Sequence, residues 1–280
     1  MSSPTVKRRR LAADLHICRE EAGLTIDDVA LQLEWSAAKI SRIENARVRV
    51  LPRDVKHLLR VYGVKEGSAQ WEILLTLARE SHQKGWWHPY GDAIRQSFST
   101  YVGLEADAES MRTYECACVP GLLQTEEYAR EVIRAGSPTA ADDEVEKYVA
   151  LRMARQANKP LTELWAVVDE GALHRLVGSA AVTRTQLDRL LECSYQPNVT
   201  MQLVPFGTGA YPSMGGAFTI LTFPEPSDPD IAYVDYSTGS LFIEKPEELL
   251  RLGLIFNHLR ASALPVNESR DAISRLGQEL

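Results

Sequence analysis

Two short helices joined by a tight turn are predicted by the segment Thr25-Ile-Asp-Asp-Val-Ala-Leu-Gln-Leu-Glu-Trp-Ser-Ala-Ala-Lys-Ile-Ser-Arg-Ile-Glu-Asn45. The apolar residues of the first helix recur at the spacing i, i+3, i+4 and i+7, and they are Ile26, Val29, Ala30 and Leu33. Ile40 and Ile43 continue an apolar stripe on the second helix. This spacing predicts that each helix buries one face and that the polar and basic side chains of the second helix stay outside.

Capping residues mark the start of both helices. Thr25 can cap the first helix, while Asp28, three positions later, can accept a hydrogen bond from the backbone N–H of the cap. Ser36 can cap the second helix, but the third helical position there is Lys39, a cation near the positive end of the helix dipole. Glu34 stands in the turn where glycine is usual, and a left-handed conformation at this residue would cost about 1 kcal/mol.

The outward face of the second helix is poor in acidic side chains, and it comprises Ala37, Ala38, Lys39, Ser41, Arg42 and Asn45. Such a face fits a groove of double-stranded DNA, where a phosphate would compensate the charge of Lys39. The alternative is an ordinary solvated surface with a plain lysine. We expect the two helices to form a DNA-reading helix-turn-helix.

With a preceding helix over Leu11 to Ala22, residues 8–66 resemble the phage-repressor-like helix-turn-helix domains of the Xre (Cro/C1) type. The string Ile40-Ser-Arg-Ile-Glu44 carries much of this likeness. The resemblance implies a structural ion pair between Glu44 and Arg19 of the preceding helix. Removing one partner of a buried pair leaves an uncompensated charge, so the loss of either residue is expected to destabilise the domain.

The same resemblance implies a set of DNA-binding residues, namely Thr25, Ser36, Ala37, Ala38, Lys39, Ser41, Arg42, Asn45 and Arg47. The two alanines offer only methyl contacts to thymine, so Arg42 is the one strong base reader, most naturally through two hydrogen bonds to a guanine. The residues assigned to phosphates are Lys39, Ser41, Asn45 and Arg47. The basic run Lys7-Arg8-Arg9-Arg10 is either an arm that adds DNA contacts or a flexible solubilising tail.

Length and charge indicate two domains. The chain has 280 residues, of which 45% are hydrophobic, enough for a second core beside a small helical domain. Residues 1–66 carry 13 Lys and Arg against 9 Asp and Glu, a balance of +4. The remaining residues must therefore carry −11 to give the net charge of −7. Only the first part attracts nucleic acid. Two further helices, over 52–63 and 67–84, complete a domain at residues 1–84, and a second domain follows at 85–280.

The second domain is predicted to be α+β, so that the whole chain joins an all-α five-helix domain to a mixed one with a partly antiparallel sheet. A helix is expected from about residue 92 onward, before the first strand, and further helices are expected near 125–135, 141–158, 183–194, 246–262 and 268–278, with a helical turn at 171–177. Strands are expected over 111–119, 164–168, 199–205, 217–223, 231–236 and 241–243. Cys116 and Cys118 would then face the same side of the first strand, and the glycine-rich segment 207–216 would be a hairpin connection.

This second part resembles the C-terminal domain of actinobacterial helix-turn-helix regulators described as antitoxin-like. The strings that carry the likeness are Val119-Pro-Gly-Leu-Leu-Gln-Thr125, Tyr128-Ala-Arg130, Arg152, Arg155-Gln156, Asp169-Glu170, Leu173, Pro197-Asn-Val199, Val204-Pro-Phe206 and Gly216-Ala-Phe-Thr219. The resemblance implies a transcriptional regulator that is linked to a small acidic partner protein. Our first hypothesis is a sequence-specific, DNA-binding repressor of its own locus that forms a homodimer, with this domain receiving the partner or supplying the dimer contact.

The sequence also admits two other functions. In the first, the C-terminal domain senses a small molecule in a pocket walled by Trp86, Trp87, Tyr211 and Phe218. In the second, acid, base and imidazole groups within one helical turn, at Asp169, Glu170 and His174, form an acid/base site. Acidic residues also favour a helix N-terminus, and no nucleophile elbow or phosphate loop is present, so we do not expect an enzyme.

No metal or other cofactor is expected. The four cysteines, Cys18, Cys116, Cys118 and Cys193, include no Cys-x-x-Cys pair, and the six histidines are scattered. No apolar run is long enough to cross a bilayer, and no signal-peptide pattern follows Met1. We therefore expect a cytoplasmic protein without a membrane partner.

Overall fold

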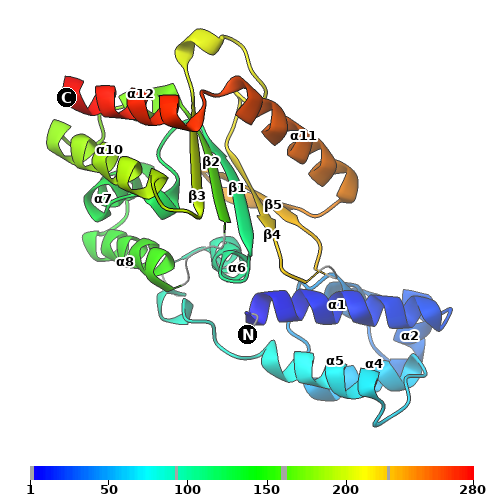
Figure 1. Ribbon diagram of the computed structural model, residues 1–280. Coiled ribbons are helices and arrows are strands. Elements are labelled where there is room, and N and C mark those ends of the chain that lie inside the picture. The colour runs from blue at the N-terminus through cyan, green and yellow to red at the C-terminus, as the bar shows by residue number, and fades with distance from the viewer. Residues whose placement is uncertain (1–2, 92–93, 159–162, 226–227) are drawn as a thin grey trace. The chain divides into compact units, whose positions relative to one another are not determined.

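The computed structural model describes residues 3–91, 94–158, 163–225 and 228–280 of the chain (Figure 1). The chain divides into two compact units, Met1–His88 and Pro89–Leu280. The described part of the first unit is helical, and that of the second unit combines helices with one six-stranded sheet. The fold class expected from the sequence is thereby confirmed.

The described part of the first unit contains five helices, and they are α1 (Pro4–Glu21), α2 (Ile26–Leu33), α3 (Ala37–Glu44), α4 (Pro52–Val61) and α5 (Ala69–Glu80). All five contribute to one apolar core. Its fully buried side chains include Leu15 of α1, Val29 of α2, Ile40 of α3, Leu58 of α4 and Leu74 of α5. The apolar stripes predicted on α2 and α3 therefore face this core.

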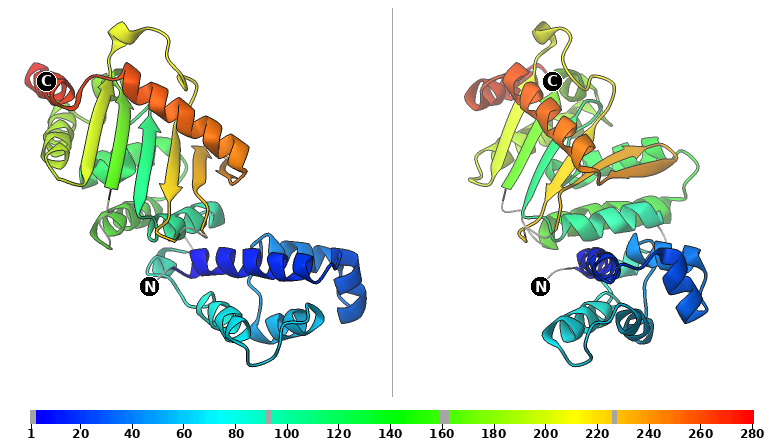
Figure 2. Two further views of the ribbon diagram at one scale, coloured as in Figure 1. Left: turned by 45° about the vertical axis from the view of Figure 1, so that its right-hand side comes forward. Right: turned by 90° about the vertical axis from the view of Figure 1, so that its right-hand side faces the viewer.

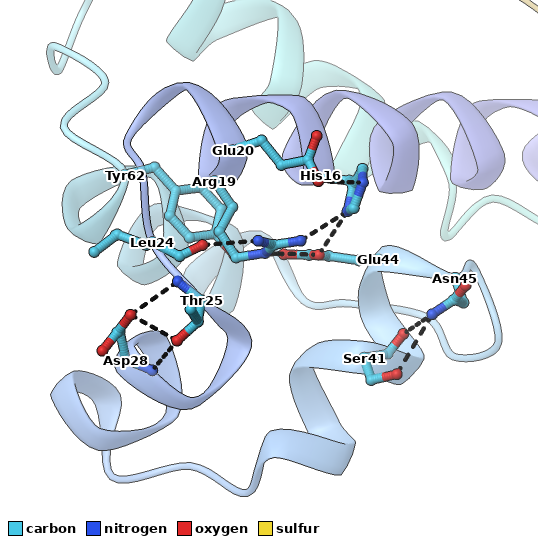
Figure 3. Close-up of polar contacts among 10 residues, drawn as sticks. All are labelled: His16, Arg19, Glu20, Leu24, Thr25, Asp28, Ser41, Glu44, Asn45 and Tyr62. Carbon is cyan, nitrogen blue, oxygen red and sulfur yellow. Dashed lines mark hydrogen bonds and ion pairs between the residues drawn. The ribbon is translucent and has the colours of Figure 1, made fainter.

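The helix ends follow the capping residues of the sequence. Thr25 and Asp28 form a reciprocal capping box, in which the Asp28 backbone N–H donates to Thr25 Oγ1 at 3.1 Å and the Thr25 N–H donates to Asp28 Oδ2 at 2.9 Å (Figure 3). Ser36 Oγ accepts from the Lys39 backbone N–H at 3.2 Å. Glu34 has φ of 55° and Ala46 has φ of 54°, so α2 and α3 are each followed by a non-glycine residue in the left-handed region.

The basic run at residues 7–10 was predicted to be an arm or a flexible tail, but it forms neither. The helix α1 begins at Pro4, with Ser3 as its cap, and includes the whole run. Lys7 is buried, and its Nζ lies 3.1 Å from Glu80 Oε2 of α5. These residues therefore belong to the helical framework of the first unit.

The strands of the second unit are β1 (Ser110–Glu115), β2 (Glu163–Asp169), β3 (Val199–Val204), β4 (Phe218–Thr222), β5 (Ile231–Tyr236) and β6 (Gly239–Ile243). Their order in the sheet is β3-β2-β1-β4-β5-β6. The strands β1, β2 and β3 pair in parallel, whereas β4, β5 and β6 pair antiparallel to their neighbours. The sheet is thus parallel in its first half and antiparallel in its second, as the order of predicted elements indicated.

The helices of the second unit are α6 (Gln96–Glu105), α7 (Glu126–Gly136), α8 (Asp142–Asn158), α9 (Glu170–His174), α10 (Ala180–Ser194), α11 (Pro246–Ser262) and α12 (Val266–Glu279). The helix α11 lies across one face of the sheet, and α6, α7, α8 and α10 lie on the other side (Figure 2). On the α11 face, Phe256 and Leu259 pack against Tyr114 and Ile220 of the central strands. Among the described residues, no helix is both long enough and apolar enough to cross a bilayer.

Two sequence predictions in the second unit were wrong. The first strand ends at Glu115, so Cys116 and Cys118 lie in the segment after it and are not held on one side of a strand. Cys116 packs against the core under α11, whereas Cys118 lines a pocket on the opposite side of the sheet. The segment 207–216 joins β3 to β4, which are separated in the sheet by β2 and β1, so it crosses the end of the sheet and is not a hairpin.

Candidate functional site

The helix α3 presents the predicted DNA-binding face to the outside of the first unit. Ile40 and Ile43 point into the core, while Ala38, Arg42 and Asn45 are exposed. The rest of the predicted set is also accessible: Thr25, Ser36 and Arg47 are exposed, and Ala37, Lys39 and Ser41 are partly buried. The structure therefore brings these residues to one helix, its two ends and the start of α2.

Arg42 is well placed to donate hydrogen bonds to a ligand. Its Nε donates to the Ala38 carbonyl, one turn earlier, at 3.1 Å. Among the described residues no carboxylate lies within ion-pair distance of its guanidinium group. The charge and the terminal nitrogens are therefore left for an external acceptor. Asn45 is held similarly, since its Nδ2 donates to the Ser41 carbonyl at 2.7 Å (Figure 3).

Lys39 differs from the expectation of a cation that waits for a phosphate. Its Nζ lies 3.2 Å from Asp54 Oδ2 in the first turn of α4 and 3.3 Å from the centre of the Trp35 ring. An acidic side chain thus compensates the Lys39 charge within the protein, which weakens its attraction for DNA. Asp54 comes from the neighbouring helix α4, so the residue pattern of α3 alone could not predict this partner.

An ion pair anchors the C-terminal end of α3 to the rest of the first unit. Arg19 Nε of α1 lies 3.0 Å from both carboxylate oxygens of Glu44, and the two residues are 7% and 9% exposed (Figure 3). Arg19 also donates to the Leu24 carbonyl at 2.8 Å, which fixes the turn before α2. The pairing that the resemblance implied is therefore present, and it joins α1 to α3.

Two further residues, not foreseen from the sequence, complete this network. The Tyr62 hydroxyl at the end of α4 donates to Glu44 Oε1 at 2.9 Å, and His16 Nδ1 lies 3.1 Å from Glu44 Oε2 (Figure 3). Burial and the neighbouring Glu44 carboxylate raise the pKa of Tyr62 far above its usual value. Tyr62 therefore stays protonated and donates its hydrogen bond at any ordinary pH.

Of the four aromatic residues expected to wall a ligand pocket, Trp86 and Trp87 belong to the first unit and Tyr211 and Phe218 to the second. Phe218 lines a pocket of about 260 Å³ in the second unit. The Tyr211 hydroxyl instead donates to Asp169 Oδ2 and lies 2.9 Å from the Tyr114 hydroxyl. Trp86 and Trp87 belong to the first unit, where Trp87 is buried and meets Trp86 edge to face.

Asp169 and Glu170, the two carboxylates of the acid/base site considered from the sequence, accept hydrogen bonds from backbone N–H groups. Asp169 caps α9 by accepting from the Gly171 N–H at 2.7 Å. Glu170 Oε2 accepts from the Phe206 N–H at 2.6 Å, and its Oε1 lies 3.4 Å from His174 Nε2. The Asp169 contact is that of a helix cap, whereas the Glu170 contact ties α9 to the segment after β3.

The strings that carry the second resemblance meet in space. Gln124 accepts from Arg152 NH1 at 2.6 Å and donates to the Val119 carbonyl at 2.7 Å. Gln156 donates to the carbonyls of Gly121 and Gln124 at 3.1 Å and 2.9 Å. The segment after β1 is therefore tied to α8 by side-chain amides, next to the pocket that Arg152 lines.

Comparison with known protein families agrees with the division of the chain into two units. Residues 10–70 match a family described as a helix-turn-helix domain, a fold typical of DNA-binding regulators. Residues 98–275 match a family described as Domain of unknown function (DUF5753). That match covers more than half of the chain, and the protein belongs to this family. No curated protein and no solved structure matches the chain.

Proposed function

We propose that this protein is a sequence-specific transcriptional regulator of the Xre type and the antitoxin-like group, which represses transcription by binding double-stranded DNA through α3. The observation that carries the proposal is the exposed Arg42 guanidinium, free of a carboxylate partner among the described residues, on a helix anchored by the Arg19–Glu44 pair. A rigid helix with one outward arginine is the arrangement that direct readout in the major groove requires. This function needs no catalytic residue.

In this proposal the exposed residues divide their roles by chemistry. Arg42 donates two hydrogen bonds to a guanine, and Ala37 and Ala38 admit the close approach of a thymine methyl group. Ser41 and Asn45 lie on the same helix, and Arg47 follows its end, where they reach the phosphates on either side of the groove. Since Lys39 already has Asp54 as its partner, we assign it a minor part in DNA affinity.

Replacing Arg42 with alanine is expected to weaken binding to the native promoter by about 10- to 100-fold, the loss of about 1–3 kcal/mol from one bidentate base contact. The preference for guanine at one position should disappear as well. Gel-shift titrations against a promoter fragment and its single-base variants measure both effects. Arg79→Ala on α5 removes the same charge from another exposed site and should leave affinity and base preference within twofold. Equal losses in the two variants would refute the placement of α3 in the groove.

A homodimer is part of the proposal, because one helix-turn-helix reads one half-site and a pair of them sets the half-site spacing. The second unit offers a surface for this contact. Leu250 and Leu254 of α11 are 68% and 54% exposed, and their spacing of four residues places them on one side of the helix. Exposed apolar side chains grouped in this way favour contact with another apolar surface. We assign this surface to a second copy of the chain.

The double variant Leu250→Glu/Leu254→Glu is expected to convert the dimer to a monomer, because four buried carboxylates would face each other across a twofold contact. Size-exclusion chromatography with light scattering measures the mass directly. Leu176→Glu changes another exposed leucine, outside α11, and should leave the dimer intact. A double variant that remains dimeric would place the contact elsewhere.

A small acidic partner protein, which the resemblance implies, completes the proposal. Residues 67–280 carry a formal charge of −11, since residues 1–66 contribute +4 to a total of −7. Two acidic proteins repel each other, so the partner would have to bind through apolar contacts. Co-purification from the native host followed by mass spectrometry of the bound protein tests this part.

A further inference from the structure

The pocket of about 260 Å³ in the second unit lies between the sheet and the helices α6 and α8. Thr113 and Glu115 of β1, Thr219 of β4 and Tyr233 of β5 line it from the sheet. Phe98 of α6 and Arg152 of α8 line it from the helices, and Cys118 and Gln124 line it from the segment after β1. The pocket lies within one unit of the chain, and its wall is partly aromatic and partly charged.

Most charged groups around this pocket already have a partner. Arg155 makes two hydrogen bonds to Glu105, at 2.8 Å and 2.5 Å, and Asp235 pairs with Arg95 at 3.2 Å. Glu115 and Arg152 are different. Arg152 has the neutral side chain of Gln124 as its hydrogen-bond partner. Among the described residues, the Glu115 carboxylate has neither a hydrogen-bond donor nor a cation within ion-pair distance.

Glu115 and Arg152 therefore face one pocket with opposite charges that are not joined to each other. Burial raises the pKa of Glu115 to about 7, and burial together with the nearby Arg155 lowers the pKa of Arg152 to about 10. In both groups the effect of burial outweighs the attraction between the Glu115 and Arg152 charges, which acts in the opposite direction. A carboxylate and a guanidinium held apart in this way leave room for a molecule that carries the complementary charges.

We propose that this pocket binds a small zwitterion, an amino acid or a close analogue, with its ammonium group on Glu115 and its carboxylate on Arg152. Arg152 suits the second role because a guanidinium can donate two parallel hydrogen bonds to a carboxylate. Phe98, Met111 and Phe218 supply an apolar wall for the rest of the molecule. The volume lies just below the usual range for ligand pockets, which limits the occupant to a small molecule. This inference does not depend on DNA binding.

Isothermal titration calorimetry of the full chain with each of the twenty protein amino acids tests the proposal. At least one amino acid is expected to bind and to raise the thermal midpoint of the protein. The amine and the carboxylic acid with the same side chain, each lacking one of the two charged groups, should bind at least about tenfold more weakly, since each loses a charge-assisted hydrogen bond. Failure of all twenty to bind, or equal binding of the amine or the acid, would overturn the proposal.

Variants assign the two contacts. Glu115→Gln and Arg152→Gln should each lower the affinity for the bound amino acid by at least about tenfold. Glu109→Gln and Arg134→Gln, exposed residues outside the pocket, are the matched controls and should bind normally. Ala217→Leu fills the pocket without a change in charge and should also weaken binding, so it decides the question if a charge variant does not fold. Unchanged affinity in a folded Glu115, Arg152 or Ala217 variant would contradict the assignment.

The pH dependence gives a second readout. Glu115 must be ionised to bind an ammonium group, so affinity should rise about tenfold between pH 6 and pH 8, and Glu115→Gln should abolish the rise. The groups that face Glu115 do not produce this change. Arg152 of α8 stays charged, Cys118 and Tyr101 stay neutral because burial raises the pKa of each, and Asp235 of β5 is paired with Arg95. A flat profile in the unmodified protein would contradict the role of Glu115.

Discussion

Replacing Glu44 with alanine is expected to destabilise the first unit by about 3–5 kcal/mol, a large share of the total stability of a domain of this size. The variant leaves the Arg19 guanidinium buried without its carboxylate, and it removes the acceptor of Tyr62 and a hydrogen-bond partner of His16. Thermal unfolding followed by circular dichroism should show the first unit melting at least about 12 °C lower.

A surface ion pair in the same unit provides the control. Glu66 lies 3.3 Å from Arg60, but both side chains are more than half exposed. Such pairs contribute little, so Glu66→Ala should change stability by less than about 1 kcal/mol. The double variant Arg19→Met/Glu44→Met should be less destabilised than Glu44→Ala, because no buried charge remains. If Glu44→Ala melted like Glu66→Ala, the network would be structurally unimportant.

Arg155→Met is expected to have an effect of similar size in the second unit. The side chains of Arg155 and Glu105 are 5% and 7% exposed, and the variant leaves the Glu105 carboxylate buried without its cation, at a cost of about 3–5 kcal/mol. The guanidinium carbon also lies 5.4 Å from the ring centres of both Phe98 and Tyr101. The substitution therefore removes a contact that joins α8 to α6 and its aromatic residues.

Differential scanning calorimetry distinguishes the two largest predictions. Glu44→Ala should shift the transition of the first unit, and Arg155→Met should shift that of the second. Lys147→Ala, which breaks an exposed pair with Asp143 on α8, serves as the control for Arg155→Met and should leave both transitions within about 3 °C. An Arg155→Met protein with an unchanged second transition would contradict the assigned role of the pair.

Local signals in the sequence were sufficient for most helices and strands. The predicted strand at 231–236 and the helix at 246–262 coincide with β5 and α11. Pro229 and Gly239 lie close to the two ends of the strand, and the helix begins at Pro246 and ends shortly before Pro265. The start of α1 was missed although its signal was present, since Ser3 followed by Pro4 is a typical cap and first helical residue.

Contacts between distant residues could not be read from local patterns. Asp54 neutralises Lys39, and Tyr62 completes the Glu44 network, yet each comes from a helix whose packing the sequence pattern does not specify. The pairing of Glu105 with Arg155 and the meeting of Glu115 with Arg152 around one pocket likewise depend on the order of strands in the sheet. The segment 207–216 was predicted to be a hairpin because the sequence does not show that β2 and β1 lie between β3 and β4 in the sheet.

The central position of β1 has a consequence for biosynthesis. Ser110 of this strand pairs with Thr222 of β4, so a ribosome must add more than a hundred further residues before the strand acquires its second neighbour. At about 5–20 residues per second, this interval lasts on the order of 5–20 s. The helices described in the first unit precede β1 and emerge earlier, so the helix-turn-helix unit can fold while the nascent sheet still exposes apolar edges that a chaperone would recognise.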